Sequence, residues 1–250
     1  MPALDTQTKV AVVGAGAMGS GIAQVAAQAG HQVYLHDQRE GAAEAGRDGI
    51  AKQLQRRVDK GKMQQQELDA VIGRIHPVAN LDDVADAGLV IEAIIEDLQI
   101  KRQLLANLEN LCAGDAILAT NTSSISVTAL GAEMNKPERL VGMHFFNPAP
   151  LMALVEVVMG LATSQAVADT VHATATAWGK KPVYATSTPG FIVNRVARPF
   201  YAESLRLLQE QATDAATLDA IIREAGQFRM GAFELTDLIG HDVNYAVTNS

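Results

Sequence analysis

Short apolar runs of strand length alternate, over the first three quarters of the chain, with stretches whose apolar residues recur at helical spacing. Such runs predict buried strands, and such stretches predict helices. The predicted strands are residues 9–13, 32–35, 88–94, 116–120, 140–145, 155–159 and 182–185. The predicted helices are residues 18–29, 41–60, 64–73, 97–111, 127–134 and a segment that includes Trp178. This alternation is typical of βαβ units, so we expect an α/β fold with a mostly parallel sheet.

The pattern changes after residue 190. No strand pattern follows, and apolar residues recur at helical spacing in residues 191–210, in 214–225 and from 235 to the end of the sequence. The sequence therefore predicts a sheet domain at residues 1–188 and an all-helical domain at residues 189–250.

The composition excludes several classes of partner. Lys and Arg total 20 against 28 Asp and Glu, a net charge of −8, whereas nucleic-acid binding needs clustered positive charge. The single cysteine, Cys112, can form neither an internal disulfide nor a cysteine-rich zinc site. Residues 10–30 are uncharged, but glycines interrupt them, which disfavours a membrane span or a signal peptide. We expect a cytoplasmic protein with no nucleic-acid or membrane partner.

A glycine-rich segment, GAGAMG, follows the first predicted strand and leads into a helix. In that setting G-x-G-x-x-G is typical of a Rossmann dinucleotide site, because the backbone can approach a pyrophosphate at the helix N-terminus. Asp37 ends the next strand, where a carboxylate accepts hydrogen bonds from a ribose 2′-hydroxyl and repels a 2′-phosphate. This favours NAD over NADP, although Arg39 leaves the preference open, and a tight turn with a solvated aspartate is the alternative. The residues predicted to bind NAD here are Gly14, Gly16, Ala17, Met18, Gly19 and Asp37.

A second candidate site is the segment HFFNP, which begins with His144 at the end of a predicted strand, with Glu156 on the next strand. Open α/β sheets bind ligands at the carboxyl ends of their strands. Imidazole suits a general base that removes a hydroxyl proton, and a carboxylate would fix its tautomer and stabilise the imidazolium. On spacing alone, a histidine with a purely structural role is the better interpretation.

Six stretches carry a resemblance to a known family: VAVVGAGAMGSGIA, VIEAIIED, ATNTSSIS, HFFNPAPLMALVEVV, TPGFIVNR and ELTDLIGHDVN. Over residues 7–250 the chain resembles the 3-hydroxyacyl-CoA dehydrogenase family, and the pairing of HFFNP with PGFIVNR is highly specific. The resemblance implies reversible oxidation of an L-3-hydroxyacyl-CoA to the 3-ketoacyl-CoA with NAD. The stretches STPGFIVNRVARPFY and FELTDLIGHDVNYAVT are most similar to bacterial members of phenylacetate catabolism. We therefore expect 3-hydroxyadipyl-CoA or 3-hydroxybutyryl-CoA as substrate.

The resemblance also implies roles for individual residues. His144 matches the family's catalytic base, and Glu156 matches the carboxylate that orients it. Ser123 matches a serine that contacts the substrate oxygen and the nicotinamide region, and Asn194 matches an asparagine that helps to hold the substrate carbonyl. The hydroxyl proton would pass to His144 while hydride passes to the nicotinamide, with no metal required.

Further positions match residues that contact the cofactor or the substrate. Glu96, Lys101 and Asn147 match cofactor contacts, and Lys60 matches a lysine that meets the phosphates of coenzyme A. The basic end of the predicted helix 41–60 suits that role, and a solvated basic face explains Lys60 equally well.

Two departures from the family pattern concern the helical domain. Residues 229–232 read Arg-Met-Gly-Ala where relatives have a P-M-G-P turn, which loosens the turn and adds a cation, Arg229, of unknown purpose. The helical domain is also shorter than the family's, which closes over the acyl chain and forms the dimer contact. We expect a homodimer only if that domain is complete.

Two alternative functions stay open. With helices missing, the chain would bind NAD with little or no turnover. A β-hydroxyacid dehydrogenase acting on free acids shares the glycine loop but uses a lysine of its helical domain, and residues 191–210 contain none. The leading hypothesis is an NAD-dependent 3-hydroxyacyl-CoA dehydrogenase.

Overall fold

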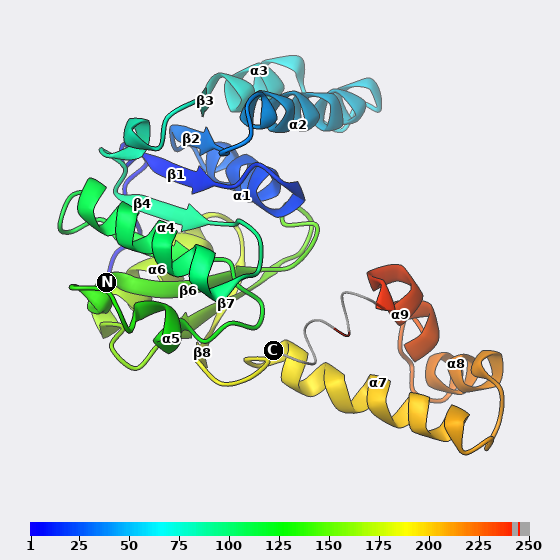
Figure 1. The fold of residues 1–250 in the computed structure, drawn as a ribbon. Coiled ribbons are helices and arrows are strands. Elements are labelled where there is room, and N and C mark those ends of the chain that lie inside the picture. Colours follow the sequence, from blue (N-terminus) through cyan, green and yellow to red (C-terminus); the bar gives the residue numbers. More distant parts are fainter. Residues whose placement is uncertain (242–244, 246–250) are drawn as a thin grey trace. The chain divides into compact units, whose positions relative to one another are not determined.

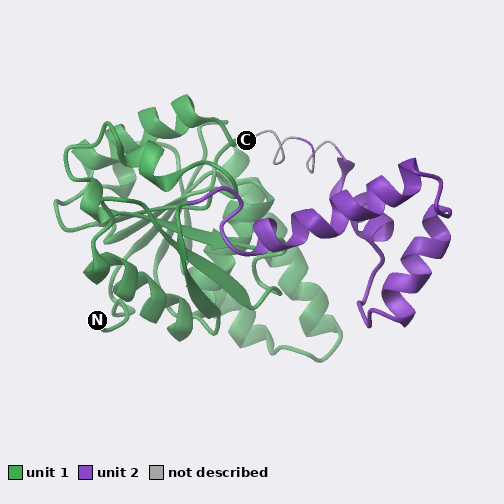
Figure 2. Cartoon of the chain, turned by 90° about the horizontal axis from the view of Figure 1, so that it is seen from below, with its two compact units in different colours: residues 1–187 green, residues 188–250 purple. Residues whose placement is uncertain are grey.

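The computed structural model describes residues 1–241 and residue 245. The chain forms two compact units, Met1–Ser187 and Thr188–Ser250, called unit 1 and unit 2 and coloured separately in Figure 2. Within the described residues, no helix is long and apolar enough to cross a membrane.

Unit 1 is built on one eight-stranded sheet with the order β3-β2-β1-β4-β5-β6-β7-β8 (Figure 1). Its strands are β1 Val10–Val13, β2 Val33–His36, β3 Ile75–Val78, β4 Leu89–Glu92, β5 Ile117–Thr120, β6 Leu140–Phe145, β7 Leu154–Met159 and β8 Lys181–Thr186. Neighbouring strands from β3 to β6 pair in parallel, β7 pairs antiparallel with β6, and β8 pairs parallel with β7. The prediction of a mostly parallel sheet is confirmed.

Helices connect the strands at the predicted places. They are α1 Ala17–Gln28, α2 Ala42–Asp59, α3 Gln65–Gly73, α4 Leu98–Leu111, α5 Val127–Gly131 and α6 Gln165–Ala177, with short 3₁₀ turns at Leu81–Val84 and Pro137–Arg139. Alternate residues of β1, Val10 and Val12, join side chains of α1 and α6 in one buried cluster. On the near side of the sheet in Figure 1, α4 crosses the strands. Helices therefore cover both faces, and functional groups are left at the ends of the strands.

One strand of the sheet, β3, is not predicted from the sequence. β3, with the sequence IHPV, lies at the edge of the sheet beside β2, and only Ile75 of its four residues is buried. Pro77 cannot donate a ladder hydrogen bond, which is tolerated at an edge. An exposed strand that contains proline has neither the apolar run nor the alternation on which the prediction depended.

Unit 2 is all-helical, as predicted, with α7 Val193–Gln209, α8 Ala215–Glu224 and α9 Ala232–Ile239. α9 begins three residues before the predicted start and ends at Gly240, whose φ of 97° is left-handed. The prediction of one helix continuing past that point is therefore wrong at Gly240, and residues 242–244 and 246–250 lie outside the described residues.

The start of α9 is held by a buried carboxylate of α8. Asp219 accepts hydrogen bonds from the backbone N–H groups of Phe233, at 2.9 Å, and Glu234, at 3.0 Å. A β-carbon at Gly231 would lie 2.1 Å from Asp219 Oδ1, so only glycine allows this approach. The turn that lacks the family's prolines is thus stabilised by a side-chain cap.

Candidate active site

The glycine loop joins β1 to α1 and matches the backbone that a dinucleotide needs. Gly14 has a φ of 105°, and a β-carbon there would lie 2.5 Å from the carbonyl oxygen of Ala93. A β-carbon at Gly19 would lie 1.7 Å from the Gly14 carbonyl oxygen, whereas one at Gly16 would meet nothing within 4 Å. Gly16 and Ala17 are exposed, and among the described residues no side chain caps the N-terminus of α1. The loop is closed on its inner side and open where a pyrophosphate would lie.

Asp37 follows β2 and is tied to the glycine loop. Its Oδ2 accepts a hydrogen bond from the Ala15 N–H at 2.8 Å, and the Arg39 guanidinium binds both carboxylate oxygens, from Nε at 3.0 Å and Nη2 at 3.2 Å. Burial pushes the pKa of Asp37 upward, but these hydrogen bonds outweigh it and lower the pKa to about 2. Asp37 is therefore a carboxylate at neutral pH, as the prediction of NAD preference requires, and Arg39 offsets part of its charge.

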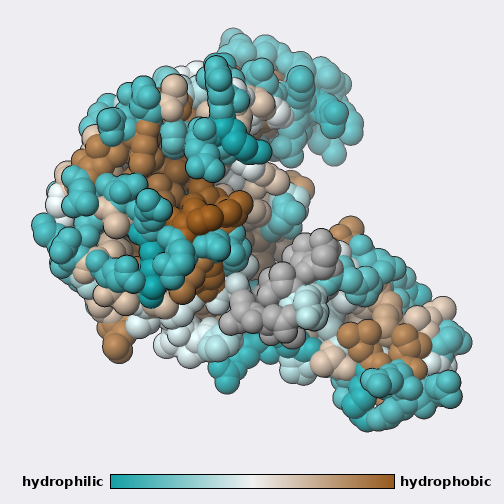
Figure 3. Space-filling model, in the orientation of Figure 1, coloured by the Kyte–Doolittle hydropathy of each residue, from teal (hydrophilic) through white to brown (hydrophobic). Residues whose placement is uncertain are grey.

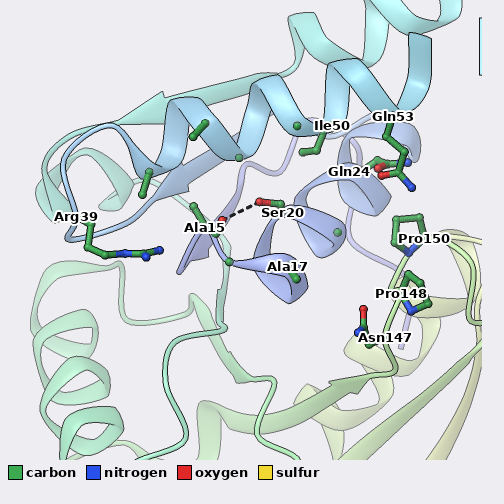
Figure 4. A pocket seen from close by; sticks show the side chains of 16 residues that line it. Ala15, Ala17, Ser20, Gln24, Arg39, Ile50, Gln53, Asn147, Pro148 and Pro150 are labelled. Atoms are coloured by element: carbon green, nitrogen blue, oxygen red, sulfur yellow. Dashed lines mark hydrogen bonds between the residues drawn. The ribbon is translucent and has the colours of Figure 1, made fainter. Parts of the chain in front are cut away.

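A cavity of about 560 Å³ lies in front of the loop, between α1, α2 and the turn after β6 (Figure 4). Gln24 of α1 is buried, and its Oε1 has no hydrogen-bond partner among the described residues. Other residues that line the cavity include Gly16, Ser20, Gln53, Asn147 and Pro150. The open glycine loop, the ionised Asp37 and this adjoining cavity fit a dinucleotide.

A buried ionic network lies at the end of β4. The Nζ of Lys101 is 2.6 Å from Glu92 Oε1 and 3.2 Å from Glu96 Oε2, and the Lys101 side chain is only 1% exposed. Thr120 at the end of β5 donates a hydrogen bond of 2.7 Å to the second oxygen of Glu92. Lys101 and Glu96 are among the residues predicted from the sequence, whereas Glu92 and Thr120 are not. In this structure Lys101 binds carboxylates, so its predicted effect on the cofactor would be transmitted through Glu96.

Glu96 shapes the Ser/Thr-rich loop that follows β5. Its Oε1 accepts hydrogen bonds from Thr122 Oγ1 at 2.5 Å and from the backbone N–H groups of Ser123, at 2.9 Å, and Ser124, at 3.1 Å. Burial raises the pKa of Glu96. The charge of Lys101 and these hydrogen bonds lower that pKa by more than burial raises it, so the net shift is downward. Two predicted cofactor positions, Glu96 and Ser123, are thereby brought into direct contact.

His144 and Glu156 form a buried pair across two strands. They are opposite one another in the antiparallel register of β6 and β7, and His144 Nδ1 is 2.7 Å from Glu156 Oε2. His144 is 5% exposed and Glu156 is fully buried. The ring of Phe146 packs 4.5 Å from the imidazole, and Asn121 Oδ1 accepts a hydrogen bond from the Phe145 N–H at 2.9 Å. The pair is fixed by sheet register, and Asn121 links its strand to the end of β5.

The remaining predicted residues lie at separate places. Asn147 is exposed and lines the cavity, and Lys60 is exposed at the C-terminal end of α2. Asn194 is the second residue of α7 and belongs to unit 2. In the part of the chain that the structure describes, no group of three or more potential ligands could hold a metal ion.

Comparison with known proteins gives matches along the whole chain. The NAD binding domain of 3-hydroxyacyl-CoA dehydrogenase matches residues 9–188, and the C-terminal domain of the same family matches residues 190–250. Residues 9–188 thus correspond to an NAD-binding domain, in agreement with the cofactor prediction.

Individual relatives support the same assignment. The chain is 51% identical to the 3-hydroxyadipyl-CoA dehydrogenase of Escherichia coli over 99% of its own length and 52% of that protein. It is 42% identical to a probable 3-hydroxybutyryl-CoA dehydrogenase of Deinococcus radiodurans, over 96% of this chain and 86% of the relative. A crystal structure described as E. coli 3-hydroxybutyryl-CoA dehydrogenase superposes with a TM-score of 0.95 at 51% identity, over 98% of this chain and 52% of that one.

This chain therefore spans about half the length of the E. coli proteins and most of the Deinococcus protein. Both family domains and the sheet topology agree. The chain belongs to the 3-hydroxyacyl-CoA dehydrogenase family.

Proposed function

We propose that this protein reversibly oxidises an L-3-hydroxyacyl-CoA to the 3-ketoacyl-CoA with NAD. The observation that carries the proposal is the buried His144–Glu156 pair, on the same sheet as the glycine loop and at the end of a central strand. NAD, when bound, supplies the hydride acceptor. The residues of the chain must then bind the substrate, remove its hydroxyl proton and stabilise the charge that results.

His144 is the proposed general base. Because Nδ1 is engaged by Glu156, Nε2 is the nitrogen that would take the proton of the 3-hydroxyl group. The C3–H bond breaks with its electron pair leaving as hydride, and the C3–O bond becomes a carbonyl. In the reverse direction the imidazolium returns the proton to the oxygen.

Glu156 is proposed to act through His144. A carboxylate on Nδ1 holds the tautomer in which Nε2 is basic, and it stabilises the imidazolium once the proton has moved. Burial strengthens this interaction, because Glu156 is shielded from water and has no competing solvent shell.

Two further side chains are proposed to hold the substrate. Ser123, whose backbone is fixed by Glu96, would donate a hydrogen bond to the substrate oxygen beside the nicotinamide. Asn194 of unit 2 would hold the thioester carbonyl. Each role rests on the match of the residue to the family motif and on its place within its own unit.

The coenzyme A part of the substrate is proposed to follow α2. Gln53 lines the cavity, and Lys60 lies seven residues later, so both project from the same side of the helix about 10 Å apart. Arg56 and Arg57 also lie in the last turn of α2. The amide of Gln53 and the basic helix end beyond it suit an amide-containing arm that ends in phosphates.

The acyl group is proposed to be short. Whether it carries a distal carboxylate is the question that the test below addresses. One E. coli relative is named for 3-hydroxyadipyl-CoA, and the Deinococcus relative is named for 3-hydroxybutyryl-CoA. A distal carboxylate would need a cationic partner, and Arg198, Arg206 and Arg229 of unit 2 are the proposed candidates. Arg206 binds Glu203 and Glu210, which it would have to leave in order to take that role.

Self-association is proposed to involve unit 2. Several large apolar side chains of its helices and turns are exposed, namely Val196, Leu205, Ile221, Phe228 and Leu238. Burial of such side chains against a second copy would remove apolar surface from water.

The test is NADH formation with a series of L-3-hydroxyacyl-CoAs, including hydroxybutyryl, hydroxyhexanoyl and hydroxyadipyl, with the free 3-hydroxy acids as controls. We expect turnover of the thioesters and none of the free acids. A kcat/KM ratio for hydroxyadipyl-CoA over hydroxyhexanoyl-CoA well above one would support the distal carboxylate, and a ratio near one would exclude it. Cofactor binding without turnover of any thioester would contradict the proposed function.

A further inference from the structure

The turn that follows β6, residues 147–152, faces the cavity through Asn147, Pro148 and Pro150 (Figure 4). Its buried residue, Ala149, packs closely on α1. A β-carbon added at Gly21 of that helix would lie 3.2 Å from the Ala149 Cβ and 3.2 Å from the Pro150 Cδ. The turn therefore has no room to move toward α1, and its position fixes that of Asn147.

Lys180, between α6 and β8, binds the same turn through two backbone carbonyl groups. Its Nζ donates hydrogen bonds to the oxygens of Ala149, at 2.6 Å, and Met152, at 2.9 Å. The amides of Leu151 and Met152 both donate to the Pro148 oxygen and so leave these two carbonyl groups to Lys180.

The ammonium group of Lys180 is buried without a carboxylate partner among the described residues, which is unusual for a lysine. The residue is 8% exposed, and within residues 1–241 and 245 it takes part in no ion pair. Burial lowers the pKa of Lys180, which reflects the cost of removing a cation from water. Lys181, the next residue, is exposed. A buried cation that binds only backbone oxygens indicates that its hydrogen-bond donors are needed there.

We propose that Lys180 is a positioning residue for the cofactor. By holding the oxygens of Ala149 and Met152, it fixes the backbone from which the Asn147 side chain meets bound NAD. Lys180 acts through the turn and touches neither the cofactor nor the substrate. The proposal rests on the proposed function for its kinetic readout, while its effect on cofactor binding can be measured without any acyl-CoA.

The first test compares two neighbouring lysines. NADH binding is titrated by fluorescence for the wild type, Lys180→Met and the matched control Lys181→Met. Loss of two hydrogen bonds to buried carbonyl groups should raise the Kd for NADH about tenfold in Lys180→Met, with a similar rise in the KM for NAD. Lys181→Met should stay within about twofold of the wild type. Unchanged affinity in a folded Lys180→Met protein would overturn the proposal.

A double-mutant cycle with Asn147→Ala separates positioning from general stability. If Lys180 acts through Asn147, Lys180→Met should change the Kd by less than about twofold in the Asn147→Ala background. The full tenfold effect in both backgrounds would overturn the proposal. If Lys180→Met does not fold, the cycle is run with Lys180→Gln, whose shorter, uncharged side chain keeps an amide NH2 group as donor. A severalfold rise in Kd is expected for this variant, and wild-type affinity would contradict the proposal.

The two proposals can fail separately. If the wild type binds NADH but oxidises no 3-hydroxyacyl-CoA, the proposed function fails, and the NADH titrations still decide the role of Lys180. If the wild type turns over acyl-CoA while the Lys180 variants keep the wild-type Kd for NADH and KM for NAD, only the role of Lys180 fails.

Discussion

The two units hold their candidate functional side chains in different ways. In unit 1 these side chains are tied into a buried sheet: His144 and Glu156 by strand register, Lys101 by two carboxylates, and Asp37 by the glycine loop. In unit 2 the candidate side chain, Asn194, lies in the first turn of α7.

Both units carry hydrophobic residues on the face turned to the viewer in Figure 3. In the smaller unit 2, side chains of α7 to α9 such as Val196 and Leu238 are more than two thirds exposed. The groups proposed for the cofactor and for the proton transfer lie in unit 1, and the proposed substrate contact Asn194 lies in unit 2. We therefore expect changes in unit 2 to affect acyl-CoA turnover without affecting NAD binding.

The largest expected effect is the loss of kcat when the proposed base, His144, is removed. His144→Ala should lower kcat by about 10²–10⁴, the usual value of a positioned acid–base group, and leave the Kd for NAD nearly unchanged. Steady-state kinetics and NADH titration measure the two effects, with His241→Ala, an exposed histidine of unit 2, as the control. Near-wild-type kcat in His144→Ala would remove His144 from the mechanism.

Removal of the orienting carboxylate should have a smaller effect of the same kind. Glu156→Gln should lower kcat by about a hundredfold, because the amide neither stabilises the imidazolium nor fixes the tautomer. The two residues act as a unit, so Glu156→Gln should add little to the loss in His144→Ala. Multiplied losses in the double variant would show that Glu156 acts independently of His144.

The comparison between the units is tested by one change in each. Asn194→Ala should lower kcat/KM for the acyl-CoA about tenfold and leave the KM for NAD unchanged, since one substrate hydrogen bond is lost. Asp37→Ala should raise the KM for NAD about tenfold and reduce the preference over NADP. The comparison fails if Asn194→Ala weakens NAD binding as much as Asp37→Ala does.

The smallest expected effect is a dependence of fold stability on pH that appears only at acidic pH. The folded pKa of Asp37, about 2, is below its ordinary value of 3.8, so its ionised form stabilises the fold above about pH 4. That contribution is lost as the pH falls from about 4 to about 2, and NAD affinity should not change through Asp37 between about pH 5 and 8. Acid unfolding of the wild type and Asp37→Ala measures this difference, which should vanish at the acid end. A difference that persists unchanged at about pH 2 would contradict the assigned pKa.

The pattern of apolar residues predicted most of the elements of unit 1, because its central strands are buried and therefore appear in the sequence as short apolar runs. It missed β3, where Pro77 and exposed residues interrupt the run. It also missed Glu92, although a signal was present: a carboxylate within the apolar stretch LVIE needs a buried partner. Lys101 shares the inner face of α4 with Leu105 and Leu108, at positions i, i+4 and i+7.

The contacts of Lys180 were not predictable from spacing. Its acceptors are backbone oxygens 28 and 31 residues earlier in the chain, and nothing in the local pattern distinguishes Lys180 from the exposed Lys181. His144 and Glu156 face each other because of the register of the antiparallel strands β6 and β7. The sequence suggests that register only through the lengths of the strands.

The most direct test of the central claim follows the hydrogen at C3. The 250-residue protein is incubated with NAD and an L-3-hydroxyacyl-CoA that carries deuterium at C3, and the products are examined by mass spectrometry and NMR. Direct hydride transfer predicts one deuterium at C4 of the NADH, none lost to water, and no reaction of the D-enantiomer. NADH without deuterium, or binding of both ligands without any NADH, would contradict it.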